Sequence, residues 1–377
     1  MMSVLVDVAS WALIVAGSCF VVCGALGLWA TSRLRSLGAV VLLAARGLAS
    51  LLRLLTRQNP AVLVRRDGTL TGVRVPVSRG AVERLAGSVA RAGRRGAEEA
   101  TLRPRLAELY DLLVAPVLGR EQLPPRLLVH AEGVLAGIPF PALYDRERGE
   151  YLVQKTAVAQ TAIPGGRPGA GDDAARGTRL LAVAADRFEA AAGLPPLRAA
   201  AEEAMAVAGV YVDPVVLTGE QATAAALRQG VRGADVLHFA GHAVLSAERP
   251  WSSRLVLAPG AGSSGAMAVP EMITAFADLS VVVLASCRSA SPDDGLAEGF
   301  AGLAEALAAA GVRATIGAIW EIGDADAAAV LLPFHQRLAA GDSPAEALQA
   351  AQVAMIGSSV ARHRSPAVWA AYRATLR

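Results

Sequence analysis

Two apolar stretches of the sequence each deliver a side chain that could take part in nucleophilic chemistry. Residues 281–285 read Val-Val-Val-Leu-Ala and lead through Ser286 to Cys287, and residues 235–241 lead to His242. A thiol attacks well only as the thiolate, and a neighbouring imidazole lowers its pKa and carries the proton. Cysteine and histidine far apart in sequence but close in the fold are what a cysteine hydrolase requires. The alternative for Cys287 is a small buried hydrophobe, the usual role of a free cysteine.

The elements that must position these two residues are buried parallel strands. A continuous apolar run bounded by turn residues is typical of a strand covered on both faces. Open α/β sheets place ligands and chemistry at the carboxyl ends of such strands. We therefore expect Cys287 and His242 at one edge of a sheet. His238 lies four residues before His242 among apolar neighbours, which favours a core or supporting role over catalysis.

Strands and helices alternate along most of the chain. This alternation predicts right-handed crossovers and a mainly parallel sheet in a three-layer α/β/α sandwich. Further strands are predicted at 126–130, 151–161, 180–185, 214–217 and 255–257, and helices at 81–117, 197–208, 223–230 and 270–277. Upstream, Asp67-Gly68 between alternating segments at 61–64 and 73–77 predicts a β-hairpin.

The motifs around the two candidate residues resemble a known family. HFAGHAVLSAERPWSSRLVLAP (238–259) together with VVVLASCRSA (281–290) is similar to the CHAT domain, a caspase-like cysteine peptidase module. Residues 295–352 match its order of helix, strand ending in Trp, acidic turn and Ser-Pro-x-Glu-Ala-Leu helix start, and 127–143 resembles its Pro-Phe-x-x-Leu hairpin. The resemblance covers roughly residues 100–377 and implies a caspase-like fold.

The resemblance also implies roles for individual residues. Cys287 would be the nucleophile, and His242 the general base and later the acid to the leaving amine. The backbone N–H groups of Ala243 and Cys287 would form the oxyanion hole. A Cys/His dyad without a third member is common among caspase-like enzymes, and His238 is a possible supporting residue. No cofactor and no metal are expected.

The sequence departs from the family pattern beside both residues. Ala243 stands where the family has glycine, so a backbone angle that needs glycine would be strained there. Ser289 and Ala290 replace the usual Thr-Gly after the cysteine. Ala285 occupies the position at which related metacaspases carry an Asp that holds a basic substrate side chain. Asp293 and Asp294 could take that role or cap the following helix.

Charge and cysteine content narrow the class of protein. The formal net charge of +3 is too small to indicate nucleic-acid binding. Cys19 and Cys23 lie within an apolar segment, and no cysteine pair has the spacing of a zinc site with histidines. Outside that segment Cys287 has no cysteine partner, which fits a reducing compartment.

Residues 9–30 contain no charged side chain and have Trp11 and Trp29 near their ends. A helix of this length spans about 30 Å, enough to cross the hydrocarbon core, so we expect a membrane anchor. A signal peptide is the rival interpretation, but it needs a basic start, and the only charge before the run is Asp7. A buried soluble helix is disfavoured because the run is apolar all round.

The flanks of this span predict its orientation. Arginines follow it, and no acidic residue occurs between Asp7 and Asp67, so we expect the N-terminus outside and the peptidase-like domain in the cytoplasm. Residues 37–55 contain Arg46 and Arg53 and suit a basic amphipathic helix on the inner leaflet. A second span, forming a hairpin, is the alternative.

The sequence therefore divides into three expected segments: a membrane anchor at 1–58, a β-hairpin and helical connector at 59–123, and a CHAT caspase-like domain at 124–377. The leading hypothesis is a membrane-tethered cytoplasmic cysteine endopeptidase of bacterial signalling or defence that cleaves a protein or peptide. The alternative is a CHAT-like scaffold without peptidase activity, and thiol-dependent acyl transfer would use the same dyad. Activation is expected to come from a partner protein or from oligomerisation in the membrane plane.

Overall fold

The computed structural model of the chain describes residues 2–6, 61–66, 69–118, 123–131, 133–161, 179–188, 194, 196–246, 249–260, 265–285 and 296–377. Cys287 and the segment 9–55, to which the sequence assigns the membrane anchor, lie outside these residues.

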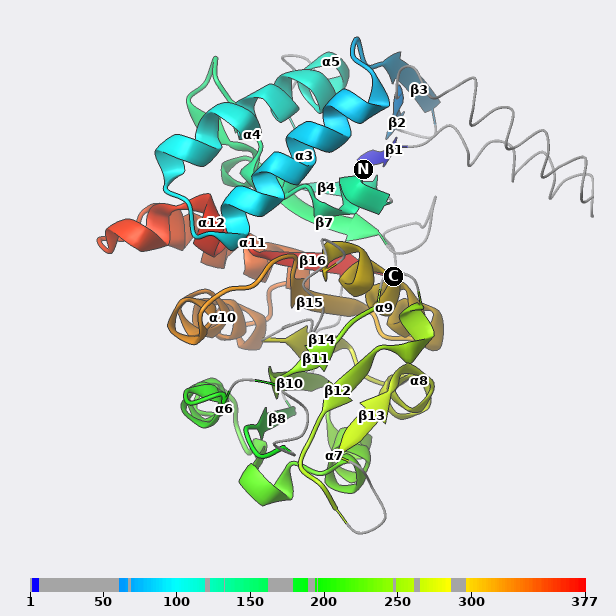
Figure 1. The fold of residues 1–377 in the computed structure, drawn as a ribbon, viewed down its shortest axis with the longest axis vertical. Coiled ribbons are helices and arrows are strands. Elements are labelled where there is room, and N and C mark those ends of the chain that lie inside the picture. Colours follow the sequence, from blue (N-terminus) through cyan, green and yellow to red (C-terminus); the bar gives the residue numbers. More distant parts are fainter. Residues whose placement is uncertain are drawn as a thin grey trace, which may run out of the picture.

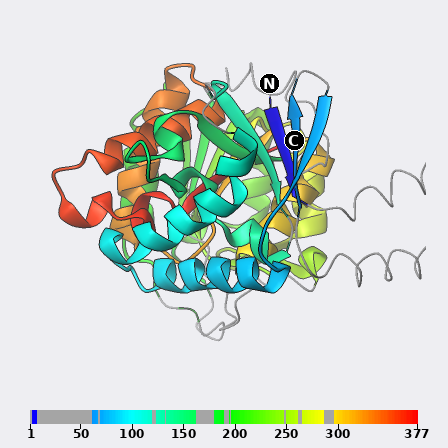
Figure 2. The same ribbon diagram turned by 90° about the horizontal axis from the view of Figure 1, so that it is seen from above.

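A mixed sheet of eleven strands forms the centre of the described structure, with helices on both faces (Figures 1 and 2). From one edge to the other its strands are β3 (Thr69–Arg74), β2 (Ala61–Arg66), β1 (Met2–Val6), β4 (Arg126–Ala131), β7 (Ala157–Thr161), β16 (Tyr372–Leu376), β15 (Ala314–Ala318), β14 (Val281–Leu284), β10 (Val236–Gly241), β8 (Leu180–Ala185) and β9 (Val215–Thr218). Most neighbouring strands are parallel, which confirms the predicted sheet type.

The sheet is divided into two blocks by its only central antiparallel contact among the described strands. Strands β1, β4, β7 and β16 are mutually parallel and form the first parallel block. Strands β15, β14, β10, β8 and β9 are mutually parallel and form the second parallel block. The blocks meet where β15 pairs antiparallel with β16, with Ala318 opposite Tyr372. The sequence pattern did not predict this division.

Helices cover the second parallel block on opposite sides (Figure 1). Helices α6 (Ala200–Ala208) and α10 (Asp324–Ala339) contact each other on one face. Helices α7 (Ala224–Gly230), α8 (Val269–Phe276) and α9 (Leu296–Ala310) lie on the other. Every residue of β8 and β10 is buried, as expected for strands enclosed between two helical layers.

The first parallel block is covered by helices from both ends of the described chain. They are α3 (Arg79–Arg94), α4 (Glu99–Leu113), α5 (Ala115–Leu118), α11 (Pro344–Ile356) and α12 (Pro366–Trp369). Helix α3 packs on α4 and α12, and α11 packs on β7. A Cβ at Gly93 of α3 would lie 2.8 Å from the ring of Trp320 and collide with it, so this close approach needs glycine.

Two small antiparallel sheets complete the described structure. One contains β11 (Ala243–Val244), β12 (Arg254–Val256) and β13 (Ala266–Ala268), and the other contains β5 (Tyr144–Asp145) and β6 (Glu150–Tyr151). The hairpin expected at 127–143 is absent, because β4 is followed by 3₁₀ turns at Gly133–Gly137 and Phe140–Ala142. The hairpin around Asp67-Gly68 is confirmed as β2 and β3.

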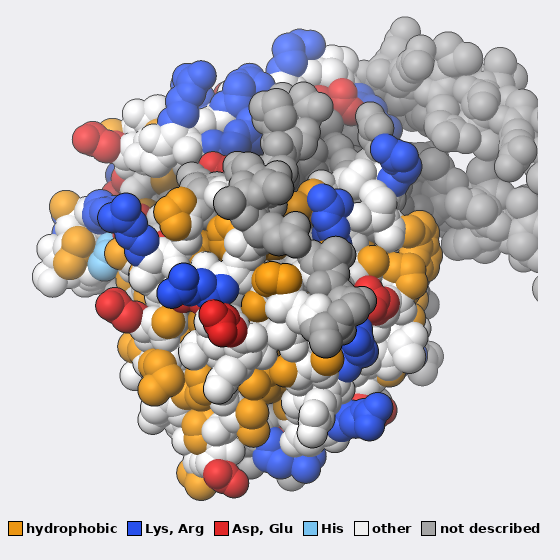
Figure 3. Space-filling model, turned by 60° about the horizontal axis from the view of Figure 1, so that its bottom comes forward, with side chains coloured by type: hydrophobic (Ala, Val, Ile, Leu, Met, Phe, Trp, Pro, Cys, Tyr) orange, Lys and Arg blue, Asp and Glu red, His pale blue; other side chains and the backbone are white. Residues whose placement is uncertain are grey.

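Apolar side chains are also prominent outside the core, at the edge of the second parallel block. Figure 3 views the molecule with this end turned forward, and orange side chains are more frequent there than charged ones. Three apolar side chains are each at least half exposed: Met205 of α6, Val212 of the following loop, and Val215 of β9.

Strand β1 changes the interpretation of the N-terminal region. Met2–Val6 lies between β2 and β4, antiparallel to the former and parallel to the latter. Residues 6 and 61 therefore belong to one sheet. No helix among the residues described here combines the length and apolar character that crossing a bilayer demands.

Candidate functional site

The two strands that precede the candidate dyad are neighbours. Strands β10 and β14 are parallel, and Phe239 pairs with Leu284 at the carboxyl end of the ladder. His242 is three residues beyond Phe239, and Cys287 is three residues beyond Leu284. The ladder thus directs both chain segments to the same edge of the sheet, as expected, although Cys287 itself lies outside the described residues.

This edge is the switch point of the second parallel block. Strand β8 comes first in the chain and has β9 on one side and β10 on the other, so the connections leave in opposite directions from the carboxyl ends of β8 and β10. Open α/β sheets bind ligands at such a point. Phe188 follows β8, and its ring meets the ring of His242 edge-on, with centroids 5.0 Å apart. His242 is fully buried.

Gly241 allows β10 to end against β8. A side chain there would place a Cβ 2.5 Å from the ring of Phe239 and 2.9 Å from the Cβ of Ala185. Real Cβ contacts are not this short, so only glycine fits before His242. Packing around the end of β10 therefore explains why glycine precedes His242 in the sequence.

Ala243 is extended and unstrained. It lies in β11 opposite Leu255, and Asp213 is the only non-glycine residue with positive φ in the described part of the chain. The strain expected for alanine at a glycine position was therefore wrong. The N–H of Val256 donates to the carbonyl of His242 at 2.8 Å, which makes Ala243 and Leu255 a non-hydrogen-bonded pair. The N–H of Ala243 consequently points away from β12.

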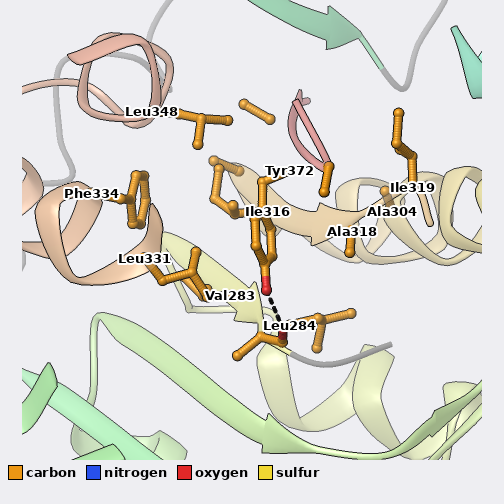
Figure 4. Close-up of a cluster of buried hydrophobic side chains, with 14 of the residues drawn as sticks. Val283, Leu284, Ala304, Ile316, Ala318, Ile319, Leu331, Phe334, Leu348 and Tyr372 are labelled. Carbon is orange, nitrogen blue, oxygen red and sulfur yellow. Dashed lines mark hydrogen bonds between the residues drawn. The ribbon is translucent and has the colours of Figure 1, made fainter. Parts of the chain in front are cut away.

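The backbone leading to the cysteine is fixed on two sides at Ala285. Its N–H donates to the carbonyl of Phe239 in β10 at 2.9 Å. Its carbonyl accepts a hydrogen bond from the hydroxyl of Tyr372, which reaches it from β16 (Figure 4). Sequence reasoning missed Tyr372, because nothing in its local sequence links it to a residue 87 positions earlier.

His238 points away from the edge and into a buried polar chain. Its Nε2 lies 3.3 Å from Oε1 of Glu203 on α6, and its Nδ1 lies 3.0 Å from Nε2 of His335 on α10. Nδ1 of His335 shares a hydrogen bond of 2.8 Å with the hydroxyl of Tyr211. We refer to Glu203, His238, His335 and Tyr211 as the polar chain. The polar chain connects α6 and α10 to β10. Nδ1 of His238 is hydrogen-bonded to His335, whereas its Nε2 lies within ion-pair distance of Glu203 and makes no hydrogen bond to a described residue.

Burial sets the protonation of this polar chain. Desolvation, and then the charge of His238, hold the pKa of His335 well below its usual value, so its imidazole is neutral at physiological pH. Desolvation also raises the pKa of Tyr211 above its usual range.

A buried cation lies at the junction of the two blocks. Arg373 is opposite Gly317 of β15, and its guanidinium donates to the carbonyl of Ala136. Desolvation lowers the pKa of Arg373 to about 9, against the opposing effect of Glu305. No group of three or more potential metal-ligating side chains gathers within the described ranges.

Comparison with known proteins assigns the chain to a family. No curated protein matches it. The family model of the CHAT domain matches residues 103–376, which include β4 to β16 and both candidate residues. This match covers most of the chain and suggests a caspase-like peptidase. The chain belongs to the CHAT domain family.

Proposed function

We propose that the chain is a caspase-like cysteine endopeptidase in which Cys287 is the nucleophile and His242 the general base. The single observation that carries the proposal is the parallel register of β10 with β14, in which Phe239 faces Leu284. The equal spacing from that pair to the two candidate residues supports their convergence. His238 is a poorer candidate because it is fully buried, its Nδ1 is hydrogen-bonded to His335 and its Nε2 faces the buried Glu203.

The proposed reaction follows from these roles. His242 takes the thiol proton while the sulfur of Cys287 attacks the scissile carbonyl, and the resulting oxyanion is stabilised by backbone N–H groups. The orientation of the Ala243 N–H, away from β12, supports its part in this hole. His242 then gives the proton to the leaving amine, and water, deprotonated by His242, hydrolyses the thioester.

The complete burial of His242 favours a second candidate function. A scaffold of CHAT type, without peptidase activity, needs no access to the dyad, and the altered residues Ser289 and Ala290 agree with it. In the peptidase the same burial requires a conformational change before substrate binds, which agrees with activation by a partner protein in bacterial signalling or defence.

Reactivity of the cysteine separates these two functions. The full chain in mild detergent is labelled with iodoacetamide across pH, and the peptide containing Cys287 is quantified by mass spectrometry, in wild type, His242→Ala and His238→Ala. We expect labelling well below the pKa of a free thiol, about 8.5, and its loss in His242→Ala alone. Ordinary titration of Cys287 in all three proteins would reject the peptidase and favour the scaffold.

We further propose that residues 7–60 tether the domain to the cytoplasmic face of a membrane as a hairpin. The uncharged run at 9–30 motivates the tether. The pairing of Leu5 with Leu63 supports a hairpin over a single span, because the chain must leave and return on the same side. The segment 37–55 would then form the returning arm.

The register of β1 and β2 provides a direct test of the tether. The pair after Leu5 and Leu63 is Val6 opposite Val62, so replacing residues 7–61 by Asn-Gly closes a two-residue hairpin. We expect this variant to keep the melting temperature of the full chain and to stop floating with lipid vesicles in a density gradient. Continued flotation would place the membrane contact elsewhere.

A further inference from the structure

Ala285 is the first residue after β14, and it leads into the segment that contains Cys287. The ladder between β14 and β15 ends one residue earlier, at Leu284 opposite Gly317. Beyond that pair the direction of the chain depends on how Ala285 is held. Its N–H is fixed by β10, through the carbonyl of Phe239.

The carbonyl of Ala285 is held by a side chain from the other parallel block. Tyr372 is fully buried and sits at the start of β16, opposite Ala318. Its ring lies among apolar side chains that include Val283, Leu284 and Ile316, with the hydroxyl directed at Ala285 (Figure 4). A ring packed in this way has one orientation available, so the hydroxyl is a fixed donor.

We propose that Tyr372 is a positioning residue that sets the direction of the backbone into Cys287. The inference rests on the proposed function of Cys287 and His242. The carbonyl of Ala285 is separated from the cysteine by Ser286 alone, so rotation of that peptide unit changes the direction in which the chain continues toward Cys287. Displacement of a reacting group by about 1 Å can cost about a hundredfold in rate.

A second consideration favours positioning over simple stabilisation. The hydroxyl contributes one hydrogen bond to a core in which the whole ring of Tyr372 is already buried. Its loss therefore removes a directional constraint while it leaves the apolar packing in place. The expected consequence is a change in thiol chemistry that exceeds any change in thermal stability.

The test compares Tyr372→Phe with Tyr110→Phe in the full chain. Tyr110 of α4 is a matched control, since its buried hydroxyl also donates to a distant acceptor, Asp145 of β5, away from the second parallel block. We measure iodoacetamide labelling of the Cys287 peptide across pH, together with the melting temperature. The expected result is at least a tenfold slower labelling at neutral pH in Tyr372→Phe, with its apparent pKa moved toward that of a free thiol, and no such change in Tyr110→Phe.

A second pair of variants keeps the test decisive if Tyr372→Phe does not fold. Tyr372→p-fluorophenylalanine fills the space of the hydroxyl without donating, whereas Tyr372→p-aminophenylalanine retains a donor and is expected to restore labelling. Labelling that depends on His242 but is the same in every Tyr372 variant would overturn the positioning role and leave the peptidase intact. Ordinary labelling of Cys287 in the wild type would overturn both.

Discussion

The two parallel blocks each carry a histidine near the end of a buried strand, but with different surroundings. In the first block, Nδ1 of His130 in β4 lies 3.1 Å from the carbonyl oxygen of Thr161 in the adjacent strand β7. In the second block, His238 contacts side chains of two helices, and His242 follows at the strand end. The strands beside β4 continue to Asp7 and Ala162, whereas β14 beside β10 leads to Cys287.

This difference shows that a histidine at a strand end does not define a site by itself. The second block combines three features: a switch point in strand order, a neighbouring strand in matching register, and a cysteine in the sequence at the same distance beyond the ladder. The first block has His130, but its strands follow one another in chain order without a switch point, and no cysteine directly follows the strands beside β4. Its contribution to the candidate site is indirect, through Tyr372 of β16.

The largest expected effect concerns the contact between the blocks. Removing residues 372–377 deletes β16, which pairs with β15 and with β7. We expect loss of cooperative unfolding by circular dichroism, because the two blocks then share no ladder. Removal of the exposed Arg377 alone is the control and should leave the transition in place. A cooperative transition without β16 would mean that one block folds alone.

The two histidines should differ in their contribution to stability. His238→Ala leaves His335 buried without its hydrogen-bond partner and empties a fully packed site between two helices, for which we expect about 3–5 kcal/mol. His130→Ala removes a hydrogen bond to a backbone carbonyl, for which we expect about 1–3 kcal/mol. Urea denaturation measures both free energies of unfolding. Equal losses would show that the polar chain is no more important than an ordinary buried hydrogen bond.

Close packing at the carboxyl end of β10 is tested by a single methyl group. Gly241→Ala forces a Cβ into Phe239 and Ala185, and overpacking of this kind costs about 1–3 kcal/mol. Gly233→Ala is the matched control, because nothing lies within 4 Å of its Cβ position. Thermal melts should separate the two variants clearly. A harmless Gly241→Ala would show that the strand end can move.

The smallest expected effect is a pH dependence that belongs to the second block. The pKa of His335 is lowered by folding, so as pH falls below about 6.5 the unfolded chain binds the proton first. Stability is therefore lost toward acid, by at most about 1.4 kcal/mol per pH unit. His238, Glu203 and Tyr211 are the titratable groups that form the polar chain with it. His335→Gln should flatten the melting temperature between pH 7 and 5, and an unchanged slope would assign it to other groups.

Local pattern was enough to predict β8, β9, β10 and β14 of the second block, whereas β15 was expected only from the family resemblance and the predicted strand at 255–257 belongs to a small separate sheet. The apolar run at 180–185 became β8 with the predicted limits, and the runs before His242 and Cys287 became β10 and β14. Buried parallel strands are continuous in sequence and bounded by turn residues, so they are easily recognised. The role of His238 in the core was predicted for the same reason.

Features that depend on distant pairing could not be predicted in this way. Met2–Val6 joins β4 across more than a hundred residues, and the apolar run that follows it led to the expectation of a single span. The antiparallel pairing of β16 with β15 and the hydrogen bond from Tyr372 to Ala285 also join residues that are far apart in sequence. Catalytic use of His242 and Cys287 stays a prediction.

The position of β16 also has a consequence for synthesis. This strand is translated after every other described strand, yet it lies inside the sheet between β7 and β15. Until it emerges from the ribosome, the nascent chain contains two unjoined half-sheets, and Ala285 has no tyrosine to fix it. A growing polypeptide therefore lacks the hydrogen bond from Tyr372 to Ala285 until synthesis of β16 is complete.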